Sequence, residues 1–211
     1  MTRAIALFAA AAAFLGLCLT AYFALPRVMD AFGGSDDFAD CRRGTVAGGT
    51  ASIGGPFTLT DGSGARVTEA DVITGPTLLY FGYAFCPDVC PFDLARNAAA
   101  ADLLAEAGVD VGLAFITIDP ERDTPTVASA FARQIHPRMV GLSGSPEDIA
   151  AAAGAYRIYF RKADDDPEFY LMDHSTFTYL AAPGQPFIEY YSAEMSAEDI
   201  AQSVACYADA L

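Results

Sequence analysis

The sequence predicts an α/β domain in which a mixed sheet carries flanking helices, preceded by an N-terminal transmembrane helix. Strand-like stretches alternate with helix-like stretches between residues 57 and 161. Two further apolar runs, 175–182 and 187–191, are joined through Pro183-Gly184 and followed by a helical pattern at 196–210. This order favours a sheet with both parallel and antiparallel strands, covered on both faces. An uncharged run near the amino terminus predicts the membrane helix.

The uncharged run extends over 22 positions, from Ala4 to Leu25. It is long enough to cross a bilayer about 30 Å thick at about 1.5 Å per residue. The apolar core of an export signal is usually about 7–15 residues, so the length favours a retained anchor over a cleaved signal. Arg3 precedes the run, whereas Arg27 is followed by several acids, so we expect a cytoplasmic amino terminus and an exported remainder.

Three segments are predicted along the chain: a membrane anchor at 1–29, a linker at 30–52 and a folded domain at 53–211. The linker is rich in Gly, Ala, Ser and Asp and has no periodic apolar pattern. Cys18 weakly resembles the cysteine of a lipoprotein cleavage site, but Leu17 is large where a small residue is needed. We therefore interpret Cys18 as a membrane residue.

The chain carries 27 acidic and 12 basic residues, a formal charge of −15. A surface of this sign repels nucleic acid and anionic lipid headgroups, and it attracts basic partners. General solubility explains the same excess and is the explanation we favour.

The elements of the domain are expected in a definite order. A hairpin of residues 57–60 and 66–68 surrounds a turn at 61–64, and a buried strand at 77–83 then leads into an Ala-rich helix at about 88–107. After these we expect a strand at 111–118, a helix from about 123 to 136, a short strand at 139–142, a helix at 145–154, a strand at 156–161, an acidic loop at 162–168, and the closing hairpin and helix.

Cys86 and Cys90 lie at the junction of the buried strand and the Ala-rich helix, each followed by a proline. Pro87 suits the first helical position, and the positive end of a helix favours thiolate over thiol. Residues four apart share a helical face at about 5–6 Å between Cβ atoms. The two sulfurs can therefore bind a soft metal, above all Cu(I), or form a redox-active disulfide. Both roles are favoured over a pair of buried, inert cysteines.

The element order is that of thioredoxin, where the site lies at the carboxyl ends of strands. Thioredoxin-like redox enzymes carry C-x-x-C and a cis-proline just before the strand that enters the hairpin. Here the pair is C-x-x-x-C, and the corresponding place holds Asp173-His174-Ser175.

Three motifs, in this order, resemble the Sco/SenC family of thioredoxin-fold copper proteins: YFGYAFCPDVCP at 80–91, ITIDPERDTP at 116–125 and DHSTFTYL at 173–180. The resemblance covers about residues 53–207. It implies a copper site made of Cys86, Cys90 and His174, in a membrane-tethered domain outside the cytoplasm. It also implies a role in building the copper centre of cytochrome c oxidase.

Two functions remain open. One is a metallochaperone, a binding protein without turnover, that delivers copper to the CuA centre during oxidase assembly. The alternative is a periplasmic thiol:disulfide reductase that keeps the oxidase copper-site cysteines reduced. A pure reductase does not need His174, so that residue discriminates between them. A peroxidase is less favoured because it leaves Cys90 unexplained.

The expected partners are the copper-bearing subunit of the oxidase, a copper donor protein and, through the anchor, the membrane; no nucleic acid is expected. The expected location is the bacterial inner membrane, with a single span and the domain in the periplasm.

Several residues outside the predicted copper site have competing interpretations. His136 is expected to be structural, and Met172 is expected to pack instead of ligating through its thioether. Asp173 either orients His174 or serves as a plain turn carboxylate. Turn and cap chemistry is preferred for the acids and the arginine of the DPERDT motif, which are Asp119, Arg122 and Asp123.

Cys41 and Cys206 remain once the membrane and motif cysteines are set aside. Such an even remainder in an exported chain predicts a disulfide between them. The alternative is a free linker thiol and a buried helix residue.

Overall fold

The structure is a computed structural model, which describes residues 20, 22, 38, 41–42, 53–163, 166 and 169–211. The chain divides into two units, Met1–Asp40 and Cys41–Leu211, and the folded domain lies in the second. Nearly all of the predicted anchor and of the predicted linker lies outside the described residues. Within the described part, no helix is both long enough and apolar enough to span a bilayer.

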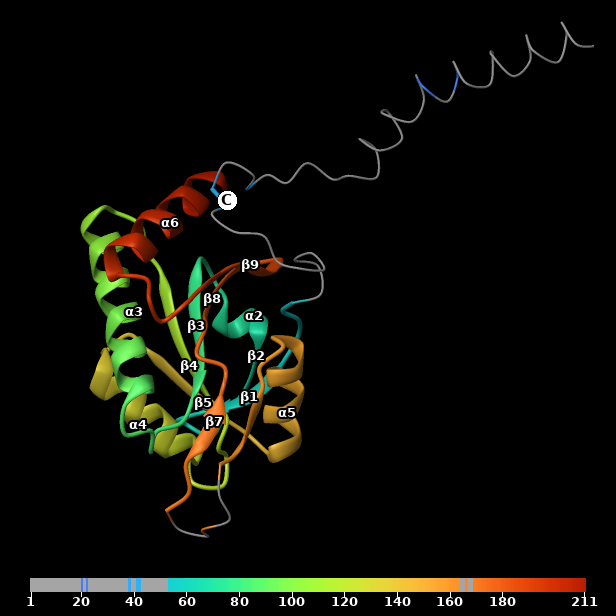
Figure 1. The fold of residues 1–211 in the computed structure, drawn as a ribbon, viewed down its shortest axis with the longest axis vertical. Coiled ribbons are helices and arrows are strands. Elements are labelled where there is room, and N and C mark those ends of the chain that lie inside the picture. Colours follow the sequence, from blue (N-terminus) through green and yellow to red (C-terminus); the bar gives the residue numbers. More distant parts are fainter. Residues whose placement is uncertain are drawn as a thin grey trace, which may run out of the picture. The chain divides into compact units, whose positions relative to one another are not determined.

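Strands and helices alternate along the folded domain, as the sequence predicts (Figure 1). The strands are β1 (Thr58–Asp61), β2 (Arg66–Thr68), β3 (Thr77–Gly82), β4 (Gly112–Thr117), β5 (Val140–Ser143), β6 (Phe160–Lys162), β7 (Met172–His174), β8 (Thr178–Ala182) and β9 (Gln185–Tyr191). The helices are α2 (Glu69–Val72), α3 (Val89–Glu106), α4 (Pro125–Ile135), α5 (Pro146–Ala155) and α6 (Ala197–Ala210).

The main sheet is mixed and has the strand order β2-β1-β5-β4-β3-β8-β9. Strand β3 runs parallel to β4 and antiparallel to β8, and β4 runs parallel to β5. All six residues of β3 are buried, as expected for a strand covered on both faces. Helices α3, α4 and α6 lie on one side of the sheet and α2 and α5 on the other (Figure 1). The predicted α/β sheet with flanking helices is therefore present.

Helix starts follow the capping signals of the sequence. The Ser145 hydroxyl accepts a hydrogen bond from the Asp148 N–H at 3.1 Å, and Pro146 occupies the first turn. At α6 the Ser196 hydroxyl accepts from the Asp199 N–H at 3.1 Å. Each cap satisfies a backbone donor that the first helical turn leaves without an intrahelical partner.

Cys41 and Cys206 form a disulfide, with their Cα atoms 5.7 Å apart. The predicted bridge is confirmed. The adjacent Arg42 donates a hydrogen bond from Nη1 to the carbonyl of Ile188 in β9 at 2.8 Å. The bridge and this contact join the start of the folded unit to α6 and β9.

The region from residue 156 to 177 differs from the sequence prediction. Helix α5 extends to Ala155, and Arg157 adopts a positive φ of 58°, so the strand expected at 156–161 shrinks to β6. Strand β7 was not predicted. It pairs with β6 in a separate two-stranded sheet, in which His174 lies opposite Phe160. The closing hairpin accordingly begins at Thr178 and not at residue 175. Helix α2 was also missed, because its four residues give no helical period.

Candidate metal centre

The two motif cysteines come together through a turn that precedes helix α3. The helix begins at Val89 with Asp88 as its N-cap, so the expectation that Pro87 opens the helix is wrong. Cys86 therefore lies outside the helix, where its N–H donates to the Tyr83 carbonyl at 3.2 Å. The N–H of Cys90 in turn donates to Cys86 Sγ at 3.4 Å. The turn, and not a shared helical face, brings the sulfurs together.

The end of β3 makes room for Cys90. A Cβ atom added at Gly82 would lie 2.9 Å from Cys90 Sγ and 2.8 Å from the Tyr80 ring. Real Cβ atoms do not approach other heavy atoms that closely, so a side chain here would displace the sulfur or the ring. Cys90 is fully buried, whereas Cys86 is half-buried. Cys86 is thus the sulfur that is open to a partner.

His174 reaches the cysteines from the end of β7. Its Nε2 lies 3.5 Å from Cys90 Sγ, and its Nδ1 lies 2.7 Å from the Ser175 carbonyl oxygen. A carbonyl can only accept, so Nδ1 carries the hydrogen and the neutral ring keeps its lone pair on Nε2, which faces the sulfur. The backbone thus orients the imidazole. Asp173 does not, because its carboxylate pairs with Arg161 at 2.6 Å.

Sγ of Cys86, Sγ of Cys90 and a ring nitrogen of His174 all lie within 4.8 Å of one another. This is the one group of three or more His, Cys, Asp or Glu side chains at metal-binding separation that occurs among the described residues. Two thiolates and a neutral imidazole suit Cu(I) in a trigonal site and can also hold Cu(II). The donor set therefore fits copper.

The pKa values of Cys86 and Cys90 are shifted in opposite directions. The hydrogen bond from the Cys90 thiol holds the pKa of Cys86 far below that of an ordinary thiol, against the opposing effect of burial. The hydrogen bond to Cys86 and burial raise the pKa of Cys90. The pair therefore shares one proton, which resides on Cys90, and Cys86 is a thiolate at neutral pH.

Comparison with known proteins identifies the family. The SCO1/SenC family model matches residues 45–209, most of the chain. The chain belongs to the SCO1/SenC family. It is 51% identical over 177 residues to protein SenC of Rhodobacter capsulatus, which covers 84% of this chain and 80% of SenC. It is 42% identical to the mitochondrial SCO1 homolog 1 of Arabidopsis thaliana over 74% of this chain, although it spans only 47% of that relative.

Solved structures of SCO1/SenC proteins share the fold. The Arabidopsis thaliana ScoI structure, determined with copper bound, has a TM-score of 0.70 and 41% identity, and covers 74% of this chain and 98% of its own. The copper-bound ScoI of Bradyrhizobium japonicum has a TM-score of 0.66 and 36% identity, over 74% of this chain and 99% of its own. The fold is the predicted thioredoxin-like one.

The contacts of His136 and Met172 account for these two residues without a metal. His136 contacts Asp102 through Nε2 at 3.2 Å and accepts the Arg138 N–H at Nδ1, which is a local structural role. Met172 is buried and lines a pocket of 180 Å³ together with Ile118 and Ile149. Packing accounts for Met172, as expected.

A buried polar cluster beside Cys90 was not predicted. The Tyr80 hydroxyl donates to Asp93 Oδ2 at 2.9 Å, and Arg96 pairs with Asp93 Oδ1 at 3.1 Å. Burial raises the pKa of Asp93, and the positive charge of Arg96 opposes that effect. The i, i+3 spacing of Asp93 and Arg96 is the signal that points to the pair.

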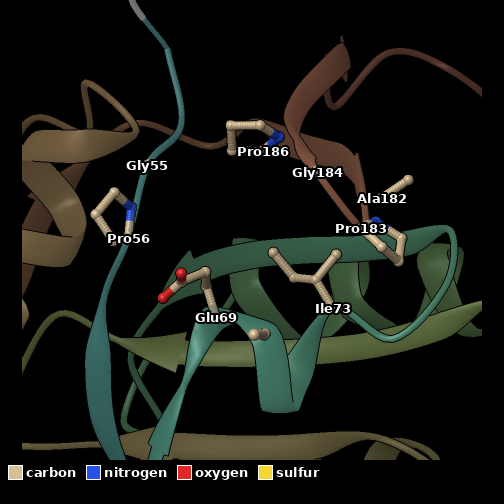
Figure 2. Close-up of a pocket in the computed structure, with 9 residues that line it drawn as sticks. Gly55, Pro56, Glu69, Ile73, Ala182, Pro183, Gly184 and Pro186 are labelled. Carbon is tan, nitrogen blue, oxygen red and sulfur yellow. The ribbon is translucent and has the colours of Figure 1, made fainter.

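A separate pocket of 290 Å³ lies between the segment before β1, helix α2 and the β8–β9 turn. Figure 2 shows Ile73 and three prolines around it, and the Glu69 carboxylate on the side of Pro56. Ala182, which also lines it, follows Ala181, the residue that pairs with Thr77 at the start of β3. The pocket is thus at the opposite end of β3 from the cysteines and takes no part in the metal centre.

Proposed function

We propose that this protein is a copper metallochaperone, which delivers copper to the CuA centre of cytochrome c oxidase during assembly of the enzyme. The observation that carries the proposal is the convergence of Cys86, Cys90 and His174 within 4.8 Å. It is supported by the copper-bound ScoI proteins, which are 41% and 36% identical to this chain. Copper is here the cargo, and all three side chains are its ligands.

The burial of the ligands suggests how copper leaves. Cys90 is fully buried at the end of β3, so it stays with the metal longest. Cys86 is half-buried on a turn, and His174 is half-buried at the end of a three-residue strand. An incoming thiolate of a recipient protein therefore displaces Cys86 or His174 first, and the metal passes through shared intermediates without becoming free.

The recipient in this proposal is the copper-bearing subunit of the oxidase, and a separate donor protein supplies the metal. The uncharged run at 4–25 supports a single-span anchor in the bacterial inner membrane, with segment boundaries at 29 and 52 and the domain in the periplasm. The disulfide between Cys41 and Cys206 agrees with such an oxidising compartment.

A second candidate, a thiol:disulfide reductase, is favoured by the low pKa of Cys86 and the contact between the two cysteines. In that reaction the Cys86 thiolate attacks a disulfide of the oxidase subunit and releases one thiolate. Cys90 then loses its proton and attacks Cys86 Sγ, which releases the second. The products are a Cys86–Cys90 disulfide and two reduced cysteines, so two electrons are transferred.

His174→Ala separates the two functions. The wild-type full-length protein should bind one copper ion per chain, with visible charge-transfer bands from thiolate to Cu(II), and should load a copper-free CuA domain. His174→Ala should lose at least tenfold in copper affinity and should not load the CuA domain. If the variant loads CuA at the wild-type rate while losing copper binding, the reductase function is the correct one.

A further inference from the structure

The copper ligands come from two separate parts of the fold. Cys86 and Cys90 follow β3 in the main sheet, whereas His174 ends β7 in the small β6–β7 sheet. The start of α3, where the cysteine turn ends, and strand β7 both lie toward the lower end of the domain in Figure 1. The position of the small sheet relative to β3 therefore decides whether the imidazole reaches the sulfurs.

Arg122, in the loop between β4 and α4, lies between these two parts. Its guanidinium carbon is 3.6 Å from the ring centre of Tyr170 and 5.2 Å from that of Phe85. Phe85 is adjacent to Cys86, and Tyr170 lies two residues before β7. Arg122 Nη1 also donates to the Tyr170 carbonyl at 2.9 Å. The Arg122 guanidinium thus contacts both the turn that carries Cys86 and the segment that leads to His174.

Asp119 holds this arrangement in place. Its Oδ2 accepts Arg122 Nε at 2.5 Å, and its Oδ1 accepts the Tyr170 hydroxyl at 2.7 Å. Asp119 and Tyr170 are each 2% exposed, so these hydrogen bonds are shielded from water and are correspondingly strong. The Tyr170 side chain is thereby fixed at both its ring face and its hydroxyl.

The same loop also fixes the cysteine turn. Asp123 is fully buried, and its Oδ2 accepts the Ala84 N–H at 2.7 Å and the Thr117 hydroxyl at 2.7 Å. Ala84 lies two residues before Cys86. The loop from Asp119 to Asp123 therefore contacts both parts of the site. Asp123 holds the cysteine turn, and Asp119 and Arg122 hold the segment before β7.

Stability alone does not account for the placement of Arg122. Its Nη2 is buried and has no hydrogen-bond partner, and a buried donor left unsatisfied lowers stability. Turn and cap chemistry, the interpretation favoured from the sequence, does not explain a guanidinium that stacks on Tyr170 and faces Phe85.

We propose that Arg122 is a positioning residue, which sets the separation between the cysteine pair and His174 and thereby completes the copper site. A planar guanidinium can stack on one ring, face another and donate in two fixed directions, whereas the point charge of lysine cannot. The inference deepens the proposed function and rests on it for the copper measurement alone.

The first test compares copper binding by full-length Arg122→Gln and Arg122→Lys. We expect Arg122→Gln to lose at least tenfold in Cu(II) affinity. Its electron paramagnetic resonance spectrum should lose the nitrogen hyperfine coupling of His174 and keep the sulfur charge-transfer bands. Arg122→Lys should retain the fold and show the same changes to a smaller degree. Arg138→Gln, which removes an arginine from the surface pair with Asp110, should match the wild type.

The second test needs no copper. In the metal-free protein, hydrogen exchange at the amides of Tyr170 and His174 should accelerate at least tenfold in Arg122→Gln, with no change at the amides of β3. Wild-type affinity and nitrogen coupling in Arg122→Gln would overturn the inference. So would uniformly faster exchange across the domain, which indicates a general loss of stability. A wild-type protein that fails to bind copper contradicts the proposed function instead, and the exchange measurement still tests Arg122.

Discussion

His174 Nε2 lies 3.5 Å from Cys90 Sγ, although 84 positions separate the two residues in the sequence. The cysteine is held by the main sheet and the first turn of α3, and the histidine by the short β6–β7 sheet. The contact joins a buried cysteine to a histidine on a small and more accessible element. Under the proposed copper-delivery function, such an arrangement binds the metal firmly and still opens for its transfer.

Copper binding and the Cys86–Cys90 disulfide should exclude each other. Oxidation joins the two sulfurs and removes both thiolates, so the metal loses two of its three proposed ligands. We expect oxidised protein without free thiols to bind less than a tenth of the copper that reduced protein binds, as measured by equilibrium dialysis. Re-reduction should restore binding. Full loading of the oxidised protein contradicts the proposed ligand set.

The reactivity of Cys86 should depend little on pH between 5 and 8. Its pKa is lowered by the hydrogen bond from Cys90, so the thiolate persists as the pH falls. An ordinary cysteine with a pKa of about 8.5 loses about tenfold in thiolate for each pH unit below that value. Alkylation of metal-free protein, followed by mass spectrometry, measures the rate at each residue. Cys90→Ala, which removes the donor, should make the rate fall more steeply with acidification. A wild-type rate that falls as steeply as that of a free cysteine excludes a thiolate at Cys86.

Gly82→Ala should destabilise the domain and disturb the copper site. The added methyl group meets Cys90 Sγ at 2.9 Å and the Tyr80 ring at 2.8 Å, and overpacking of this kind costs about 1–3 kcal/mol. Gly75→Ala is the matched control, because its added methyl group meets no atom within 4 Å. Denaturant unfolding and copper titration of both variants measure the effects. Equal unfolding free energies for the two variants argue against the close packing at Gly82.

Removal of the Cys41–Cys206 disulfide should lower the stability of the folded unit. The bridge spans 165 positions, and chain-entropy models give about 4–5 kcal/mol for loops of this order, although measured bridges often contribute less. Cys206→Ser and Cys41→Ser should show similar losses in unfolding free energy, with copper stoichiometry unchanged. Two alkylatable thiols at these positions in non-reduced protein argue against the bridge.

Phe92→Ser should slow copper transfer without changing copper binding. Phe92 is 72% exposed and lies two residues after Cys90, and Phe85 beside Cys86 is also exposed. Exposed aromatic side chains beside a transfer site are suited to contact the recipient, where such anchors dominate binding. We expect the rate of CuA loading to fall about tenfold. Leu103→Ser, an exposed position farther along α3, is the control. Equal rates for wild type and Phe92→Ser exclude this contact.

Elements with strong local patterns could be predicted before the structure was known. The buried strand, predicted at 77–83, and the long helix, predicted at about 88–107, follow from apolar runs and Ala-rich sequence. The helix starts at Ser145 and Ser196 follow from their caps. The disulfide was predicted by counting the cysteines that the membrane segment and the motifs leave over. These features depend on neighbouring residues or on counting, so they need no knowledge of the folded chain.

Other features depend on contacts between distant segments and on the backbone of turns, and they became visible only in the folded protein. Cys86 lies in a turn ahead of α3, which the i, i+4 spacing could not distinguish from a helical face. The position of His174 depends on the pairing of β7 with β6 across the acidic loop. Strands of three residues are too short to show a periodic sequence pattern, so this pairing could not be predicted. Arg122 had the sequence signature of a turn residue, and its contacts with Tyr170 and Phe85 exist only because folding brings three loops to one end of the sheet.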